Sequence, residues 1–112
     1  MPFETVDIET LQDNPWKLIG KEWMLVTAGN IASWNTMTAS WGGLGVLWNR
    51  RVAFVFVRPS RHTFGFMNRE GRFTLSFLPE GHREILSKCG SVSGRDADKA
   101  ALTGLEPFEP EP

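Results

Sequence analysis

From Trp23 to Asn49 the chain runs for 27 residues without a charged side chain. Twelve of these residues are Gly, Ser, Thr or Asn, and this share of polar residues excludes a membrane-spanning segment. Two interpretations remain open for the stretch. It forms strands and turns around a barrel core, or it offers backbone groups and tryptophans to a flat, uncharged ligand.

Four segments carry the apolar or alternating patterns of β-strands. They comprise residues 23–28, 36–41, 52–57 and 72–78. We expect a turn at Gly29 and Asn30 after the first strand. We expect Gly42, Gly43 and Gly45 to break the second strand and to permit a bulge or a close backbone approach.

Three short helices are predicted between and after these strands. The first runs from an N-cap at Ser60 to about Asn68, with Gly71 beyond its end. The second spans residues 82–89, ends at Gly90, and places Ile85, Leu86 and Cys89 on one face. The third spans residues 96–102. Strands with short helices between them, and no repeating βαβ unit, predict a mainly β fold with short helices, as a small barrel or an α+β domain.

The size and the ends of the chain predict one domain. A chain of 112 residues, 41% hydrophobic, forms a single core over residues 1–112. We expect residues 1–15 to form an N-terminal arm and residues 106–112 a loose, acidic, Pro-rich tail. The acidic start of the chain is unlike a signal peptide, and the single cysteine excludes a disulfide framework. We therefore expect a cytoplasmic protein without a membrane partner.

The net charge of −1 hides a basic middle between acidic ends. Residues 1–49 carry −3, residues 50–99 carry +5 and residues 100–112 carry −3. Nucleic-acid-binding domains are usually basic as a whole, so nucleic acid is not expected as a partner. The basic middle indicates either an anion site or a solvated basic face.

Residues 57–63 combine a strand end, Pro59, an expected helix start and two arginines, Arg58 and Arg61. Free N–H groups at a helix start and nearby guanidinium groups bind phosphate, and Thr63 adds a hydroxyl. The alternative is an ordinary capped helix with surface arginines.

Residues 91–99 join Ser, Gly and charged residues at another helix start. They could hold polar groups of a ligand. The alternative is a helix capped by Asp96 with Lys99 in solvent.

The sequence offers little acid–base or metal chemistry. His62 and His82 are 20 residues apart and lack the spacing of metal ligands. Cys89 lies on an apolar helix face, where cysteine is usually a buried hydrophobe. No nucleophile elbow, Walker loop or dinucleotide fingerprint is present. An enzyme built from this inventory would depend on a cofactor for its chemistry.

Four blocks in this order resemble the flavin reductase-like family, in its flavoredoxin-type branch. They are residues 35–45 (NTMTASWGGLG), 55–59 (VFVRP), 73–77 (FTLSF) and 89–99 (CGSVSGRDADK). The resemblance runs from about residue 16 to 105. It implies the FMN-binding split-barrel fold and a homodimer that holds FMN near the subunit interface. It also implies an oxidoreductase that passes hydride or electrons from NADH or NADPH through FMN to a flavin or another acceptor, with no catalytic side chain or metal of its own.

The resemblance also implies which residues bind the cofactor. One segment would line the isoalloxazine ring, a second would hold the phosphate and ribityl end, and a third would form a further binding loop. In that order they are Thr36, Met37, Thr38, Ala39, Ser40 and Trp41; Arg58, Pro59, Ser60, Arg61 and Thr63; and Ser93, Gly94, Arg95 and Lys99.

The sequence departs from the family pattern in length, because family members continue with further strands after the last matching block. We therefore expect a split β-barrel that lacks the C-terminal strands, with a second subunit covering the open surface. Two alternatives to the reductase follow: an FMN-binding electron-transfer module, and a truncated dimeric form without cofactor.

Overall fold

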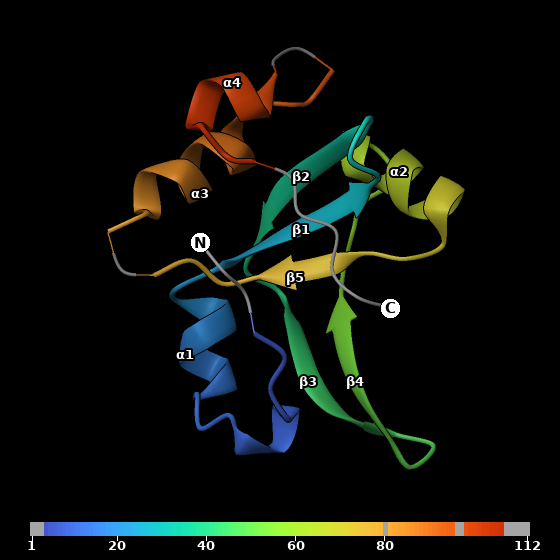
Figure 1. Ribbon diagram of the computed structural model, residues 1–112, viewed down its shortest axis with the longest axis vertical. Helices are drawn as coiled ribbons and strands as arrows, with labels where there is room; N and C mark the ends of the chain where they lie inside the picture. The colour runs from blue at the N-terminus through green and yellow to red at the C-terminus, as the bar shows by residue number, and fades with distance from the viewer. Residues whose placement is uncertain (1–3, 80, 96–97, 107–112) are drawn as a thin grey trace.

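The computed structural model describes residues 4–79, 81–95 and 98–106 (Figure 1). Its elements are short and follow one another closely. In chain order they are the 3₁₀ turn η1 (Ile8–Thr10), α1 (Pro15–Gly20), β1 (Met24–Gly29), β2 (Trp34–Ala39), β3 (Gly42–Leu47), β4 (Arg50–Val55), α2 (His62–Glu70), β5 (Thr74–Ser76), α3 (Arg83–Ser91) and α4 (Lys99–Thr103).

A three-stranded antiparallel sheet has the order β2-β1-β5. The central strand β1 pairs Val26 with Met37 of β2 and with Leu75 of β5. Met24, Leu25 and Val26 are all buried, as expected for a strand flanked on both sides and covered on both faces. The predicted strand over residues 72–78 shortens to three residues in this sheet.

The strands β3 and β4 form a separate antiparallel hairpin. The glycines that we expected to break the second strand instead lie inside β3, and the break falls at Ser40 and Trp41. The aromatic ring of Phe54 lies over Gly43 and Gly45, where a Cβ would make ordinary contact at 3.4 or 3.6 Å. The expected close backbone approach occurs at Gly42, where a Cβ would clash with the carbonyl oxygen of Phe54.

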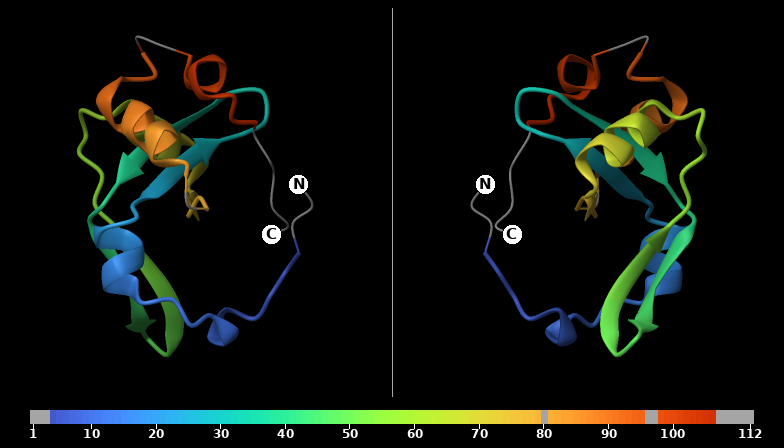
Figure 2. Two further views of the ribbon diagram at one scale, coloured as in Figure 1. Left: turned by 90° about the vertical axis from the view of Figure 1, so that its left-hand side faces the viewer. Right: turned by 90° about the vertical axis from the view of Figure 1, so that its right-hand side faces the viewer.

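The helices α2 and α3 cover opposite faces of β2. Asn35 of β2 contacts Thr63 of α2, whereas the hydroxyl of Thr38 donates to the carbonyl oxygen of Leu86 in α3. Side chains three positions apart on a strand point to opposite faces, so the sheet is enclosed between the two helices. Figure 2 shows the N-terminal arm passing outside the sheets before α1.

The core under α3 contains Leu25, Leu86 and Cys89. This packing confirms the predicted apolar face of the helix. Burial raises the pKa of the Cys89 thiol, and the nearby Lys99 opposes that shift. Cys89 is therefore a neutral packing residue at ordinary pH.

Three helix ends differ from the sequence predictions. Arg61, with no side-chain hydrogen bond, is the N-cap of α2 in place of Ser60. Gly90 lies inside α3, which ends at Ser91. Asp98 caps α4, whereas the predicted cap Asp96 lies outside the described residues. Gly71 ends α2 in the left-handed conformation, as the sequence predicts, and Gly104 ends α4 in the same way.

Within the described residues the two sheets remain separate and do not close into a barrel. None of the helices there is long and apolar enough to cross a membrane. The antiparallel strands with short helices between them are confirmed, but the described helices cover about as many residues as the strands, so the fold is α+β and the prediction of a mainly β fold is wrong.

The close approach at Gly42 predicts a matched pair of variants. Gly42→Ala should lower the free energy of unfolding by about 1–3 kcal/mol, because the new methyl group overpacks against a backbone oxygen that cannot move freely. Gly45→Ala should be close to neutral, since its Cβ would make ordinary contact with Phe54. Urea unfolding followed by tryptophan fluorescence measures both. Equal losses would contradict the explanation.

Candidate functional site

A cavity of about 540 Å³ lies at the end of β2 where the strand leaves the β1–β2 turn. We call it the β2-end cavity. Residues from the turn, β2, α2, the segment after α3, and α4 line it: Ala32, Ser33, Trp34, Asn35, His62, Gly94, Arg95, Asp98, Lys99 and Ala100.

Lys99 is buried beside this cavity, with only 5% of its surface exposed. Its Nζ donates to the carbonyl oxygen of Thr36 at 2.5 Å and to that of Cys89 at 3.0 Å. Burial lowers the pKa of Lys99 and the charge of Arg61 lowers it further, whereas Cys89 acts in the opposite direction. The alternative that placed Lys99 in solvent is wrong.

Asn35 and Gly94 fix a second wall of the cavity. The Nδ2 of Asn35 donates to the Oγ1 of Thr63 at 2.8 Å, and both residues are buried. Gly94 packs so closely that a Cβ would lie 2.8 Å from Cδ2 of His62 and would clash with the amide of Asn35. Gly94 is therefore the residue that lets its segment approach α2 and β2.

Arg95 joins the two predicted binding segments. Its Nη1 donates to the carbonyl oxygen of Ser60 at 3.2 Å, and its backbone N–H donates to the Oγ of Ser93 at the same distance. Residues 58–63 and 93–99 are therefore neighbours in the fold. Of the predicted residues in these two segments, Gly94, Arg95 and Lys99 line the β2-end cavity, whereas the first segment contributes only His62.

Positive charge dominates the cavity. Burial lowers the pKa of His62, and the charges of Arg95 and Lys99 lower it further. The carboxylate of Asp98 accepts from the backbone N–H groups of Ala100 and Ala101 at 3.0 and 3.3 Å, as the cap of α4. A cluster of cationic side chains whose lining carboxylate is already hydrogen-bonded favours an anionic ligand.

The predicted segment of residues 36–41 lies partly in β2, which ends at Ala39, and partly in the link to β3. The hydroxyl of Thr36 is hydrogen-bonded to the hydroxyl of Thr27 at 2.9 Å. The hydroxyl of Thr38 donates to the carbonyl oxygen of Leu86. Met37 is buried in the core, and Trp41 is 66% exposed. Trp41 lies five residues from Thr36, roughly 16 Å of extended chain. None of residues 36–41 lines the cavity, whose wall on β2 ends at Asn35.

The other predicted residues lie close by or on the surface. Arg58, Pro59 and Ser60 are exposed, and the carbonyl oxygen of Arg58 accepts from the backbone N–H of Arg61 at 3.0 Å. Arg61 is half-buried and close enough to Lys99 to affect its titration. Thr63 is buried behind the cavity wall.

Sequence reasoning missed Trp34, Asn35, His62 and Asp98 as lining residues. A signal existed for Asn35, because asparagine is disfavoured in strands and usually has a specific hydrogen-bonding role there. His62 lies between Arg61 and Thr63, which are both predicted to bind the cofactor, but from the sequence His62 is weighed only as a metal ligand. No cluster of possible metal ligands occurs in the part of the chain that the structure describes.

The model of the flavin reductase like domain family matches residues 17–110 of the chain. The chain is also similar to the solved structure of an FMN-binding domain of a flavin reductases-like enzyme from Shewanella baltica OS155, with a TM-score of 0.71. Sequence identity is 23%, and the likeness covers 87% of this chain and 51% of the Shewanella chain. The chain thus spans about half the length of that protein and shares its fold. No curated protein matches the sequence.

The surroundings of His62 predict a dependence of stability on pH. Its pKa is lowered from 6.5 in the folded chain, so the unfolded chain takes up the proton first as the pH falls. The stabilisation is therefore present above about pH 6.5 and is lost as the pH falls through the folded-state pKa. In urea unfolding at pH 8 and pH 5, His62→Gln should lose less stability on acidification than the wild type.

His82→Gln, at the exposed start of α3, is the control for loss of a histidine. An unchanged acid dependence in the His62 variant would contradict the lowered pKa that burial and the neighbouring charges give it.

Proposed function

The chain belongs to the flavin reductase like domain family, and on that basis we propose that it is an FMN-binding oxidoreductase whose β2-end cavity receives the phosphate of FMN. The observation that carries the proposal is a cationic cavity lined by the predicted residues Gly94, Arg95 and Lys99, with the other predicted segment held beside it by the hydrogen bond from Arg95 to Ser60. Because this chain spans about half of the Shewanella protein, its own activity has to be tested directly.

The residues of the cavity fit a phosphate group. Among the lining residues Arg95 supplies a guanidinium group, Lys99 an amine and His62 an imidazole. Arg61 is not a lining residue, but it lies close enough to Lys99 to lower its pKa and would supply a second guanidinium group. Phosphate is recognised in proteins by such charge-assisted hydrogen bonds. Gly94 lets the segment that carries Arg95 pack against Asn35 and His62, where any side chain would clash.

The uncharged strand that leaves the cavity suits the neutral ring of FMN. The hydroxyls of Thr36 and Thr38 are already hydrogen-bonded within the protein. Ala39, Ser40 and Trp41 therefore remain as the residues that would contact the ring. A ligand with an anionic end and a flat neutral end would follow β2 from the cavity towards Trp41.

FMN, when bound, supplies hydride acceptance and electron transfer, and this chain supplies binding and orientation. We assign no acid–base step to the described residues around the cavity. We propose NADH or NADPH as the electron source and a flavin or another acceptor as the electron sink. In the proposed assembly two copies of the chain form a homodimer.

The second candidate function is an FMN-binding electron-transfer module without its own nicotinamide reaction. It is favoured because the sequence carries no recognisable determinant for a nicotinamide cofactor, such as a dinucleotide fingerprint. Anaerobic mixing of the FMN-loaded protein with NADH or NADPH separates the two functions. Rapid bleaching of the flavin absorbance supports the reductase, and an unchanged spectrum supports the module.

Flavin binding itself can be tested with two ligands that differ only in the phosphate. The fluorescence of FMN should be quenched when it binds. FMN should bind at least about tenfold more tightly than riboflavin, because riboflavin lacks the phosphate and loses one or more charge-assisted hydrogen bonds. Fluorescence titration of each flavin measures the difference. Equal affinities would contradict the phosphate site, and binding of neither flavin would support the form without cofactor.

Arg61→Ala should weaken the binding of FMN by about 1.5–3 kcal/mol, because a charged contact with the phosphate is lost. The same variant should leave the affinity for riboflavin unchanged. Arg69→Ala, on the exposed face of the same helix α2, is the matched control. A loss of affinity for both flavins would assign Arg61 a structural role instead.

A further inference from the structure

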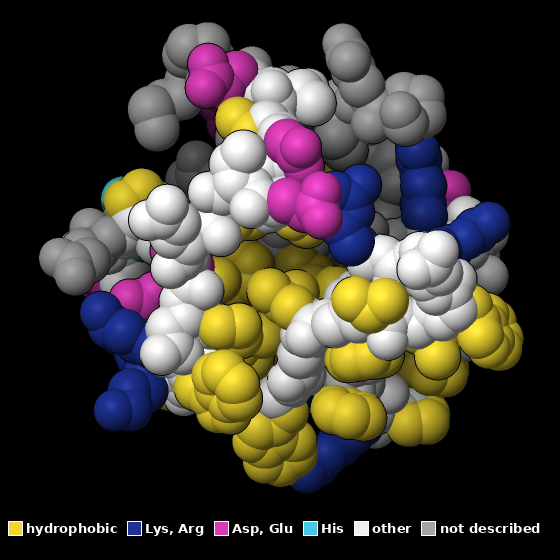
Figure 3. Space-filling model, turned by 90° about the horizontal axis from the view of Figure 1, so that it is seen from below, with side chains coloured by type: hydrophobic (Ala, Val, Ile, Leu, Met, Phe, Trp, Pro, Cys, Tyr) yellow, Lys and Arg dark blue, Asp and Glu magenta, His cyan; other side chains and the backbone are white. Residues whose placement is uncertain are grey.

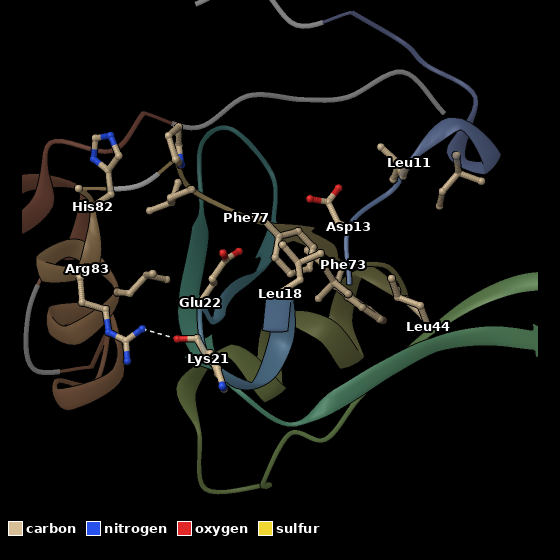
Figure 4. A pocket seen from close by; sticks show the side chains of 17 residues that line it. Leu11, Asp13, Leu18, Lys21, Glu22, Leu44, Phe73, Phe77, His82 and Arg83 are labelled. Carbon is tan, nitrogen blue, oxygen red and sulfur yellow. Dashed lines mark hydrogen bonds between the residues drawn. The ribbon is translucent and has the colours of Figure 1, made fainter. Parts of the chain in front are cut away.

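The two histidines of the chain line two different cavities. His62, the first residue of α2, lines the β2-end cavity. His82, the N-cap of α3, lines a larger and mostly apolar cavity of about 1030 Å³ (Figure 4). We call this larger one the arm cavity, because Leu11 and Asp13 of the N-terminal arm line it. Each histidine can therefore be used to observe one cavity.

The arm cavity is not cationic. Among its described lining residues two are acidic and two are basic, namely Asp13, Glu22, Lys21 and Arg83. The guanidinium group of Arg83 is already engaged, because it donates to a backbone carbonyl oxygen at 2.6 Å and packs over the ring of Trp23. Figure 3 shows apolar side chains gathered at the end of the molecule that carries α1 and the β3–β4 hairpin. We therefore expect an anion to act on His62 and to leave His82 unaffected.

The imidazole of His62 is positioned by packing. Its ring meets the ring of Phe66, one turn further along α2, edge to face with the centroids 5.1 Å apart. Gly94 approaches so closely that a Cβ there would lie 2.8 Å from the Cδ2 of His62. Within the described part of the chain neither ring nitrogen has a hydrogen-bond partner. The ring thus keeps its hydrogen-bonding capacity for a ligand in the cavity.

The charged groups around His62 are mostly cationic. Arg95 lies in the segment after α3, Lys99 lies at the start of α4, and Arg61 directly precedes His62 in the chain. The carboxylate of Asp98 also lines the cavity, but it accepts from two backbone N–H groups of α4. The described lining from the β1–β2 turn and β2 includes no charged residue. Burial and the charges of Arg95 and Lys99 lower the pKa of His62, so the ring is mostly neutral at pH 7 when no ligand is bound.

A bound phosphate reverses this electrostatic balance. A phosphate monoester carries a charge of about −2 above pH 7, because its second pKa is about 6. Among these cations it offsets the charges that disfavour a protonated imidazole, and it accepts a charge-assisted hydrogen bond from the imidazolium. The pKa of His62 should therefore rise when the dianion binds.

We propose that His62 binds the phosphate of FMN in its protonated form, so that the β2-end cavity takes up one proton together with the cofactor, a coupling that rests on the FMN site proposed above and adds its regulation by pH. The proton comes from solvent to a ring nitrogen on binding and returns to solvent on release. Because the ring holds the proton only in the complex, proton and FMN favour each other's binding. FMN is retained at slightly acid pH and released as the pH rises above neutral.

Inorganic sulfate tests the coupling without flavin. Sulfate stays a dianion throughout the pH range in which histidine titrates, so the protein alone supplies the titrating group. NMR of the imidazole C–H groups measures the pKa of both histidines, and His82→Gln assigns the two signals. Saturating sulfate should raise the pKa of His62 and leave that of His82 unchanged, with sodium chloride at equal ionic strength as the control. An unchanged pKa of His62, or an equal rise for both histidines, would overturn the proposal.

The affinity for FMN at pH 6.5 and at pH 8.5 tests the same proton with the cofactor. The wild type and the control His82→Gln should bind FMN at least about fivefold more weakly at pH 8.5, within the limit of about tenfold per pH unit that one proton allows. His62→Gln cannot take up the proton, so its affinity should be nearly equal at the two pH values.

The outcomes of this titration separate the coupling from the FMN site itself. The pKa of Lys99 is also lowered, and a pH dependence that persists in His62→Gln would assign the proton to Lys99 and overturn the proposal. Tight binding of FMN that does not change with pH would overturn the coupling and leave the FMN site standing. Failure to bind FMN at either pH would overturn both.

Discussion

The buried amine of Lys99 holds together parts of the chain that are far apart in sequence. It donates to the carbonyl oxygen of Thr36 on the edge strand β2 and to that of Cys89 near the end of α3. It is also the first residue of α4, whose N-terminus Asp98 caps. Without this amine, two carbonyl groups would lose a donor, and the segment after α3 would lose its attachment to the sheet.

That arrangement positions the remaining groups of the β2-end cavity. Once the segment after α3 lies against β2, Gly94 packs on Asn35 and His62, and Arg95 reaches the carbonyl oxygen of Ser60. A buried amine without a carboxylate partner is unfavourable in a folded chain, because burial disfavours its charged form. The same charge becomes favourable once an anion binds, and this explains why such a residue suits a phosphate site.

Much of the fold follows from local sequence. The β1 strand, the apolar face of α3 and the glycine ends of α2 and α4 are determined by patterns within a few residues. The glycines of β3 were misinterpreted because their partner is Phe54, which faces them only after the hairpin forms. Likewise Arg61, and not Ser60, caps α2, because the turn closed by the Arg58–Arg61 hydrogen bond shifts the start of the helix.

The candidate site was partly accessible to sequence reasoning. The basic middle of the chain and the two segments around Arg61 and Arg95 indicated an anion site, and the structure brings these segments together. The contributions of Trp34, Asn35 and His62 depend on the approach of α2 and the Gly94 segment to the end of β2, which no local pattern encodes. The burial of Lys99 is likewise not encoded locally, because the carbonyl oxygens that accept from its amine belong to Thr36 and Cys89, 63 and 10 residues away.

A crystal structure of the chain with FMN would test the central claim most directly. The account predicts the phosphate within hydrogen-bond distance of Arg61 or Arg95, with the ring extending along β2 towards Trp41. A phosphate bound elsewhere on the chain, or a flavin seated in the arm cavity, would contradict it.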